Sequence, residues 1–250
     1  MNTIKFDKGN VQVVAHRGLS GLEPENSIPA FVAAGNRSYF GVETDIHVTK
    51  DGKFIVIHDE TTTRVAGDTI NVEECTYDFA RKFVLDNICK VERDSEVKIG
   101  DLKGRNDLLL PRLEDYINIC KKYEKIAVLE VKNRMQPEIL EQLVEEIKSL
   151  DYLENVIFIS FCLENMIDLR KLLPNQELQY LTCEFNDDVH NALKEYNLDW
   201  DVLYHALSKE LIDQLHGEGI KINCWTVDKR EDAERLAGWG VDFITTNILE

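Results

Sequence analysis

The sequence predicts an α/β fold, a (β/α)₈ TIM barrel with an insertion after the second strand. About eight short runs rich in Val and Ile alternate with segments that carry apolar residues at helical spacing. Strands of this composition, when most are followed by a helix, pair in parallel and are covered on both faces. Such a series of units within 250 residues also matches the usual size of this barrel.

Each element is predicted from its local pattern. The β-branched or apolar runs predict strands over residues 11–15, 40–46, 54–57, 126–131, 156–160, 178–181, 201–204, 220–226 and 241–245. Apolar residues at helical spacing predict helices over residues 27–35, 113–123, 137–150, 163–173, 187–196, 208–216 and 229–237. Pro137 suits a first helical turn, and Asn186 or Asp187 and Ser208 suit N-terminal caps. Gly238 or Gly240 is expected to end the last helix.

An open doubly wound sheet is the alternative fold. It would place a glycine-rich G-x-G-x-x-G turn directly after the first strand. Here that turn reads His16-Arg17-Gly18-Leu19-Ser20-Gly21, which lacks the pattern. The barrel is therefore the favoured prediction.

Residues 59–110 interrupt the alternation of strands and helices. The stretch is polar, with charge clusters such as Glu92-Arg93-Asp94-Ser95-Glu96, and it is too long for an ordinary connection. We expect one domain over residues 1–250, in which residues 59–110 form an inserted subdomain on the barrel rim. A surface excursion with little order is the alternative.

The composition excludes several classes of protein. With 46 acidic against 29 basic residues the formal net charge is −17, while 44% of the residues are hydrophobic and 30% are charged, as in ordinary globular proteins. The excess of acid argues against a nucleic-acid partner and against anionic membrane surfaces. The partner expected instead is a small molecule.

No targeting signal is recognised in the sequence. Residues 1–10 are polar, and no run of about 18 apolar residues predicts a membrane-spanning helix. We therefore expect a cytoplasmic protein without stable membrane insertion. The six cysteines are scattered and form no C-x-x-C pair, so reduced thiols are expected rather than disulfides or a zinc site.

Polar and aromatic residues gather where the predicted strands end. Barrel enzymes keep their chemistry at the carboxyl ends of the strands. The residues found at or near these ends are His16, Arg17, Glu43, Asp45, His58, Asp59, Glu130, Lys132, Ser160, Phe161 and Trp225. Because side chains alternate along a strand, Glu43 and Asp45 share one face, and Glu130 and Lys132 also share one face.

Three buried carboxylates need positive charge nearby. A hard divalent cation with oxygen ligands, Mg²⁺ or Ca²⁺, would satisfy Glu43, Asp45 and Glu130 if they meet at one mouth. Ion pairs with Arg17 and Lys132 would satisfy the same carboxylates without a metal. Spacing alone leaves both interpretations open.

A hairpin is expected to bring a histidine back to the acidic pair. Lys50-Asp51-Gly52-Lys53 is a strong turn signal. If Asp51 and Gly52 are the two turn residues, Asp45 lies opposite His58. His47 shares the face of Glu43 and Asp45, but for it a structural role is favoured over a direct one.

Together these residue types suit the cleavage of a phosphodiester with an alcohol leaving group. Histidine exchanges protons near neutral pH. The guanidinium fork of arginine fits phosphate oxygens. A bound metal ion polarises a phosphoryl oxygen.

The segment from Val13 to Asp59 resembles the glycerophosphodiester phosphodiesterase family. The matching motifs in this segment are His16-Arg17-Gly18, Pro24-Glu25-Asn26-Ser27, Ala30-Phe31, Glu43-Thr44-Asp45, Thr49-Lys50-Asp51-Gly52 and His58-Asp59. Later matches are Leu113-Glu114, Leu129-Glu130-Val131-Lys132, Ser160-Phe161, Trp225-Thr226-Val227-Asp228 and residues 240–247. The resemblance covers nearly the whole chain and is least informative over residues 59–110. It departs from the family at His47, where an uncharged amide is frequent, and in the tail Thr245-Thr246-Asn247, where many members have Thr-Asp followed by a short turn that contains proline.

The resemblance implies a barrel, a function and a site. It implies metal-dependent hydrolysis of glycerophosphodiesters to sn-glycerol 3-phosphate and an alcohol. The implied roles are metal binding for Glu43, Asp45 and Glu130; general acid/base catalysis for His16 and His58; phosphate binding for Arg17 and Lys132; the alcohol side of the pocket for Phe161 and Trp225; and support of the first loop for Glu25 and Asn26.

Other functions on the same scaffold remain as alternatives. One is a lysophospholipase D or a phospholipase that forms cyclic phosphates. Another is a barrel that binds a phosphate ester without turning it over. The insertion is not strongly apolar, which favours a small polar head group such as glycerol. The nucleophile, either water or a neighbouring glycerol hydroxyl, stays open, as do the leaving alcohol and the oligomeric state.

Overall fold

The structure, a computed structural model, describes residues 2–85 and 105–250. Its strands are β1 (Gln12–Ala15), β2 (Gly41–Val48), β3 (Phe54–Val56), β4 (Ile126–Val131), β5 (Val156–Ser160), β6 (Leu178–Thr182), β7 (Asp199–Leu203), β8 (Ile222–Trp225) and β9 (Phe243–Thr246). Its α-helices are α1 (Ile28–Gly35), α2 (Tyr77–Ala80), α3 (Leu113–Lys122), α4 (Pro137–Ser149), α5 (Leu163–Leu172), α6 (Asp187–Glu195), α7 (Lys209–Gly217) and α8 (Arg230–Trp239). Short 3₁₀ turns are η1 (Thr62–Arg64), η3 (Asn106–Leu108), η4 (Leu153–Asn155) and η5 (Tyr204–Ala206).

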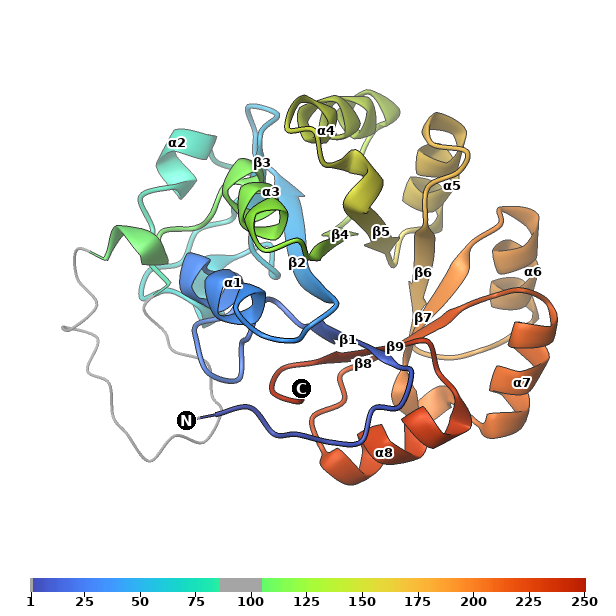
Figure 1. Cartoon of the computed structure of the whole chain (residues 1–250). Helices are drawn as coiled ribbons and strands as arrows, with labels where there is room; N and C mark the ends of the chain where they lie inside the picture. The colour runs from blue at the N-terminus through green and yellow to red at the C-terminus, as the bar shows by residue number, and fades with distance from the viewer. Residues whose placement is uncertain (1, 86–104) are drawn as a thin grey trace.

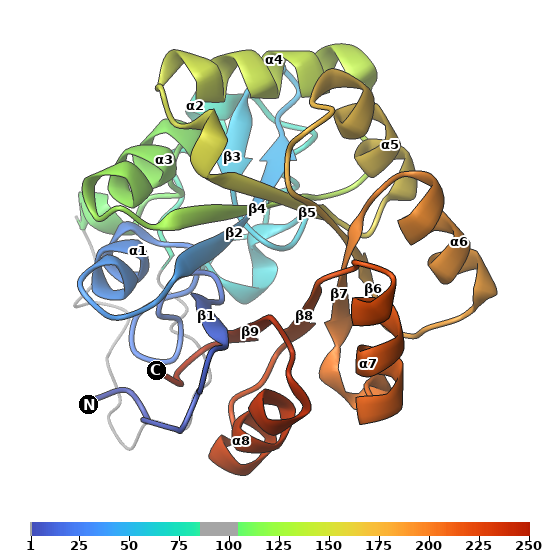
Figure 2. The ribbon, with the colours of Figure 1, turned by 45° about the vertical axis from the view of Figure 1, so that its right-hand side comes forward.

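In the described part of the chain the strands form one sheet in the order β1-β9-β8-β7-β6-β5-β4-β2-β3. Pairing of β1 with β2 closes this sheet, and every neighbouring pair except β2–β3 is parallel. The helices lie around the outside of the strands, as Figures 1 and 2 show from two directions. The predicted TIM barrel is therefore confirmed, with β3 as an additional antiparallel strand at its edge.

Local signals place the helix ends close to the predicted positions. Ser27, Asn186 and Ser208 each cap a helix by accepting a hydrogen bond from the backbone N–H three residues further on. Gly240 ends α8 with φ 92°, a left-handed conformation that favours glycine. Strand β7 begins two residues before the predicted start, because Asp199 and Trp200 already pair with β6.

The predicted register of the β2–β3 hairpin is wrong by one residue. Ile46 pairs with Val56 and Val48 with Phe54, so the loop has three residues, 50–52, instead of two. The Gly52 N–H donates to the Thr49 carbonyl, and Gly52 has φ 73°, as in three-residue hairpin loops that end on a left-handed glycine. Ile57, and not His58, therefore lies opposite Asp45. His58 follows the end of β3.

Apolar side chains fill the barrel below its mouth. Val14, Val128, Ile157, Ile159 and Leu181 form a separate buried cluster inside the ring. They alternate along their strands with residues of the larger core between strands and helices. The polar residues at the strand ends therefore lie above a packed floor.

The insertion has a small core of its own in its described part. Ile55 of β3 and Ile57 just after it pack there with residues of the insertion, namely Val65, Val72, Ala80, Leu85 and Leu110. Residues 86–104 of the predicted 59–110 subdomain, with Cys89, lie outside the described residues. The other five cysteines are free thiols. Among the helices of the described residues, none is long and apolar enough to span a membrane.

Candidate active site

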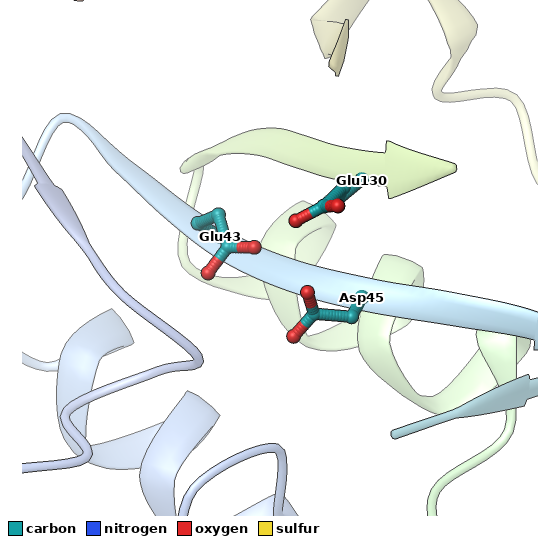
Figure 3. Close-up of side chains that lie close together, drawn as sticks. All are labelled: Glu43, Asp45 and Glu130. Carbon is teal, nitrogen blue, oxygen red and sulfur yellow. The ribbon is translucent and has the colours of Figure 1, made fainter. Parts of the chain in front are cut away.

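Three carboxylates meet at the mouth of the barrel. Glu43 and Asp45 extend from β2, and Glu130 extends from β4, where the strand register pairs it with Asp45. One oxygen of each carboxylate lies within 4.8 Å of the others, and the three side chains converge between the two strands (Figure 3). The residues are only 3%, 1% and 6% exposed, so their charges are poorly solvated.

Two cationic side chains partly compensate this acidic group. Arg17 Nε lies 3.6 Å from Asp45 Oδ2, and the backbone N–H of Arg17 donates to Glu43 Oε2 at 2.7 Å. Lys132 Nζ lies 2.8 Å from Glu130 Oε1 and 3.5 Å from Asp45 Oδ1. Asp45 thus has a cation on each side, whereas Glu43 is bound mainly by a backbone amide.

The pKa values reflect this uneven compensation. Burial opposes ionisation of Asp45, but Arg17 and Lys132 outweigh it and hold its pKa below the usual range. Burial, and then the charge of Asp45, raises the pKa of Glu130 to about 8 and that of Glu43 well above its ordinary value. With protein charges alone, Glu43 and Glu130 therefore hold their protons more strongly than ordinary carboxyl groups do.

This donor set fits a hard divalent cation. Asp45 Oδ1 is buried and has no hydrogen-bond partner among the described residues. A cation at this point would take that oxygen as a ligand and would let Glu43 and Glu130 ionise as well. Ion pairs account for Asp45 and, through Lys132, for Glu130, but among the described residues no ion pair reaches Glu43.

Hydrogen bonds fix the orientation of Asp45. Asn26 Nδ2 donates to Asp45 Oδ2 at 2.8 Å, and Thr44 Oγ1 donates to Asn26 Oδ1 at 2.7 Å. Asn26 adopts φ 51° in the loop after β1, a left-handed conformation that asparagine tolerates. Glu25 in the same loop accepts a hydrogen bond from Arg17 Nη1 at 2.8 Å. This loop therefore holds both a carboxylate and a cation of the site.

His16 follows β1 and is held by the residue that comes after the last strand. Its Nδ1 lies 2.8 Å from Asn247 Oδ1, an oxygen that also accepts from the Ser20 hydroxyl. The amide group of Asn247 donates to Asp228 Oδ2 at 2.6 Å, so Oδ1 is the side that faces His16. The imidazole Nδ1–H is therefore the donor, and Nε2 remains available. Burial, followed by the neighbouring Arg17, lowers the pKa of His16 to about 4.

His58 is held from the insertion side. Its Nδ1 lies 2.6 Å from Asp59 Oδ1, which fixes the proton on Nδ1. Arg64 in η1 donates from Nε to Asp59 Oδ2 at 2.8 Å and from its two terminal nitrogens to Glu25 at 2.6 and 2.9 Å. Arg64 thus connects the support of His58 with the support of Arg17. Burial lowers the pKa of His58, against the opposing charge of Asp45.

These groups surround one narrow cavity of about 50 Å³. Its lining residues come from both histidine loops and from most barrel strands: His16, Arg17, Glu43, His58, Glu130, Ile159, Phe161, Leu181, Asp201, Trp225 and Thr245. Phe161 and Trp225 are in edge-to-face contact with ring centroids 5.7 Å apart. Lys132 lines an adjoining hollow with Glu130 and Phe161.

The structure brings the sequence-predicted residues together at this mouth, with Glu25 and Asn26 just behind it. His47 is buried outside the cavity lining, where its Nε2 lies 3.0 Å from the His58 carbonyl and its Nδ1 2.7 Å from Glu73. Arg64 and Asp201 were not singled out by sequence reasoning. The early start of β7 explains the second omission, because Asp201 is a mid-strand residue and not the first of its strand.

The fold and this mouth define a TIM-barrel enzyme. Residues 16–250 match the model of the glycerophosphoryl diester phosphodiesterase family. The chain is 34% identical to a glycerophosphodiester phosphodiesterase of Caldanaerobacter subterraneus subsp. tengcongensis, across 95% of this chain and 94% of that one. It belongs to the glycerophosphoryl diester phosphodiesterase family.

Solved structures resemble the whole chain. A phosphodiesterase of Oleispira antarctica, solved in complex with the product sn-glycerol-3-phosphate, has a TM-score of 0.82 at 19% identity and covers 94% of this chain and 92% of its own. A glycerophosphodiester phosphodiesterase of Parabacteroides distasonis has a TM-score of 0.76 at 28% identity, with 95% and 93% covered. The fold is therefore shared over nearly the full length.

Proposed function

We propose that this enzyme hydrolyses glycerophosphodiesters to sn-glycerol 3-phosphate and an alcohol, with the help of a divalent cation. The observation that carries the proposal is the approach of Glu43, Asp45 and Glu130 within 4.8 Å at the mouth that His16 and His58 also line. The names of the family and of its relatives, and the product in the Oleispira antarctica complex, support the same reaction.

Glu43, Asp45 and Glu130 hold the cation, which is Mg²⁺ or Ca²⁺ because both prefer carboxylate oxygens. When bound, this ion supplies positive charge against the phosphoryl oxygens of the ester. Arg17 and Lys132 flank the same carboxylates and bind the phosphate by charge-assisted hydrogen bonds. These local cations offset the unfavourable approach of an anion to a chain of net charge −17.

His16 and His58 exchange the protons. Both keep a proton on Nδ1 and can turn Nε2 to the ester. His16, with a pKa lowered to about 4, is neutral at pH 7 and takes the proton of the nucleophile, which is water or a glycerol hydroxyl. His58, whose Nδ1–H is held by Asp59, carries a second proton on Nε2 in the reactive form and donates it to the oxygen of the departing alcohol.

The insertion belongs to the same proposal. We propose that residues 59–110, of which the structure describes 59–85 and 105–110, act as a rim subdomain of one domain over residues 1–250. Its contact with the site through Arg64 supports a role beyond covering the surface.

The experiment is an activity panel of glycerophosphodiesters that carry choline, ethanolamine, glycerol or inositol. Each is assayed with Mg²⁺, with Ca²⁺ and with EDTA, and sn-glycerol 3-phosphate is detected directly. We expect its release with either or both ions, loss of activity in EDTA, and recovery when the ion is restored. A lysophosphatidylcholine arm tests the lysophospholipase D alternative.

Two outcomes would contradict the proposal. Undiminished hydrolysis in a metal-free sample would remove the cation from the mechanism. Faster hydrolysis of the lysophospholipid than of every glycerophosphodiester would replace the substrate class.

A further inference from the structure

Asp201 is a buried acid in the cavity to which the proposed reaction assigns no role. It lies in the middle of β7, is 2% exposed, and lines the cavity together with His16, Glu43 and Glu130. Its Oδ1 has no hydrogen-bond partner among the described residues. A buried polar atom without a partner costs free energy, which a hydrogen-bonding ligand in the cavity would recover.

The neighbouring polar side chains are committed elsewhere. Asn223, which is paired with Asp201 across β7 and β8, donates from Nδ2 to Gln179 Oε1 at 3.1 Å. Its Oδ1 accepts from the Thr245 hydroxyl, also at 3.1 Å. On the other side of Asp201, the register places Leu181 of β6, which has no polar group. The barrel itself therefore leaves Asp201 for a ligand.

The cations of the site also serve other groups. The ion pairs of Arg17 join it to Glu25 and Asp45, and those of Lys132 join it to Asp45 and Glu130. No ion pair within residues 2–85 and 105–250 involves Asp201. A phosphate group would meet no positive charge at this point and is expected at Arg17 and Lys132 instead.

A hydroxyl group is the ligand that fits an acid in this setting. It can donate to a carboxylate oxygen and can accept from a protonated carboxyl group, so it suits either form. An ammonium group would need the ionised form in a nearly dry environment.

We propose that Asp201 binds a hydroxyl group on the glycerol part of the phosphate ester, and thereby selects polyol phosphates over esters that lack hydroxyls. This rests on the proposed function for the substrate class. It places the phosphate at Arg17 and Lys132 and the polyol against β7.

The test compares two phosphate monoesters that differ in their hydroxyl groups. Binding of sn-glycerol 3-phosphate and of methyl phosphate is measured by calorimetry in the presence of Mg²⁺. The proteins are the wild type, Asp201→Leu, Asp201→Asn and the control Asp199→Asn. Asp199 lies at the start of the same strand, where it accepts from the Lys221 backbone N–H.

We expect the wild type to prefer sn-glycerol 3-phosphate. Asp201→Leu should lower the affinity for this ligand roughly 10–100-fold and leave the affinity for methyl phosphate within about threefold of the wild-type value. Asp201→Asn, which still hydrogen-bonds, should stay within about fivefold of the wild type for both. Asp199→Asn should change neither affinity.

Equal weakening of both ligands by Asp201→Leu would overturn the proposal, as would a wild type without any preference. The variant Asp201→Asn guards against a folding defect, because it retains size and polarity. Hydrolysis is recorded separately. A preserved preference for sn-glycerol 3-phosphate in a protein that cleaves no glycerophosphodiester would contradict the proposed function and leave the role of Asp201 intact.

Discussion

The two sides of the barrel mouth are built on different principles. The charged wall, formed by Arg17, Glu43, Asp45, Glu130 and Lys132, is joined by ion pairs and hydrogen bonds. The apolar wall, formed by Ile159, Phe161, Leu181 and Trp225, surrounds the single acid Asp201. Removing one group from the charged wall leaves a buried partner without compensation, whereas a change in the apolar wall removes contacts only. We infer that the charged wall constrains the reaction and that the apolar wall adjusts the substrate.

The largest effect is expected at the histidines beside the charged wall. His16→Ala or His58→Ala should lower kcat by about 10²–10⁴-fold, because each removes one proton-transfer group. Circular dichroism and calorimetric Mg²⁺ binding should show a folded protein that retains the cation. His190→Ala is the control, since His190 pairs with Glu218 on the outside of the barrel. Turnover close to that of the wild type in either variant would remove that histidine from the mechanism.

The pH dependence of stability tests the burial of His16. Its pKa is about 4 in the folded state against an ordinary value of 6.5, so the unfolded chain binds more protons between these values. The contribution of His16 to the free energy of unfolding is therefore complete above pH 6.5 and is lost as the pH falls toward 4. At pH 5 the loss is about 2 kcal/mol. Denaturant unfolding of metal-free wild type and His16→Gln at pH 7 and pH 5 measures the difference. If both proteins change in parallel, His16 is not a buried neutral imidazole.

Replacing Arg64 should have a smaller effect on the reaction, because Arg64 acts indirectly through Asp59 and Glu25. Arg64→Ala removes the link between Glu25 and Asp59 and should lower kcat roughly 10–100-fold, with less change in KM, because His58 loses its fixed orientation. Arg64→Lys should retain only part of the wild-type kcat, since one ammonium group cannot reproduce the guanidinium fork. The control is Arg112→Ala, which breaks ion pairs to Asp115 and Glu114 away from the mouth. Identical kinetics for Arg64→Ala and Arg112→Ala would show that the link is structural only.

The charged wall and the apolar wall also differ in how far the sequence predicts them. Strand periodicity predicts the barrel, and side-chain parity predicts that Glu43 faces the same way as Asp45. Both are local properties of a strand. The strand ends also supply His16, His58, Arg17 and Lys132, and the family motifs add the roles of these residues.

Other features depend on spatial information that no local pattern contains. The hairpin register depends on whether Gly52 closes a two- or three-residue loop, and the same Asp-Gly pair suits both. The role of Arg64 depends on its contact with Glu25, which forms only because the insertion folds back onto the loop after β1. Asp201 is recognised as a candidate ligand-binding residue only when the structure shows that its neighbours hydrogen-bond to other groups.

The smallest effect is expected on the apolar wall. Phe161 is 45% exposed and contacts Trp225 edge to face at 5.7 Å, so its ring contributes little to the core. Phe161→Ala should raise KM about 3–10-fold, in keeping with the loss of one aromatic pair, and leave kcat and the unfolding midpoint nearly unchanged. Phe161→Tyr keeps the ring and should behave like the wild type. A fall in kcat as large as that of His58→Ala would mean that the two walls share the chemistry, and the contrast between them would have to be abandoned.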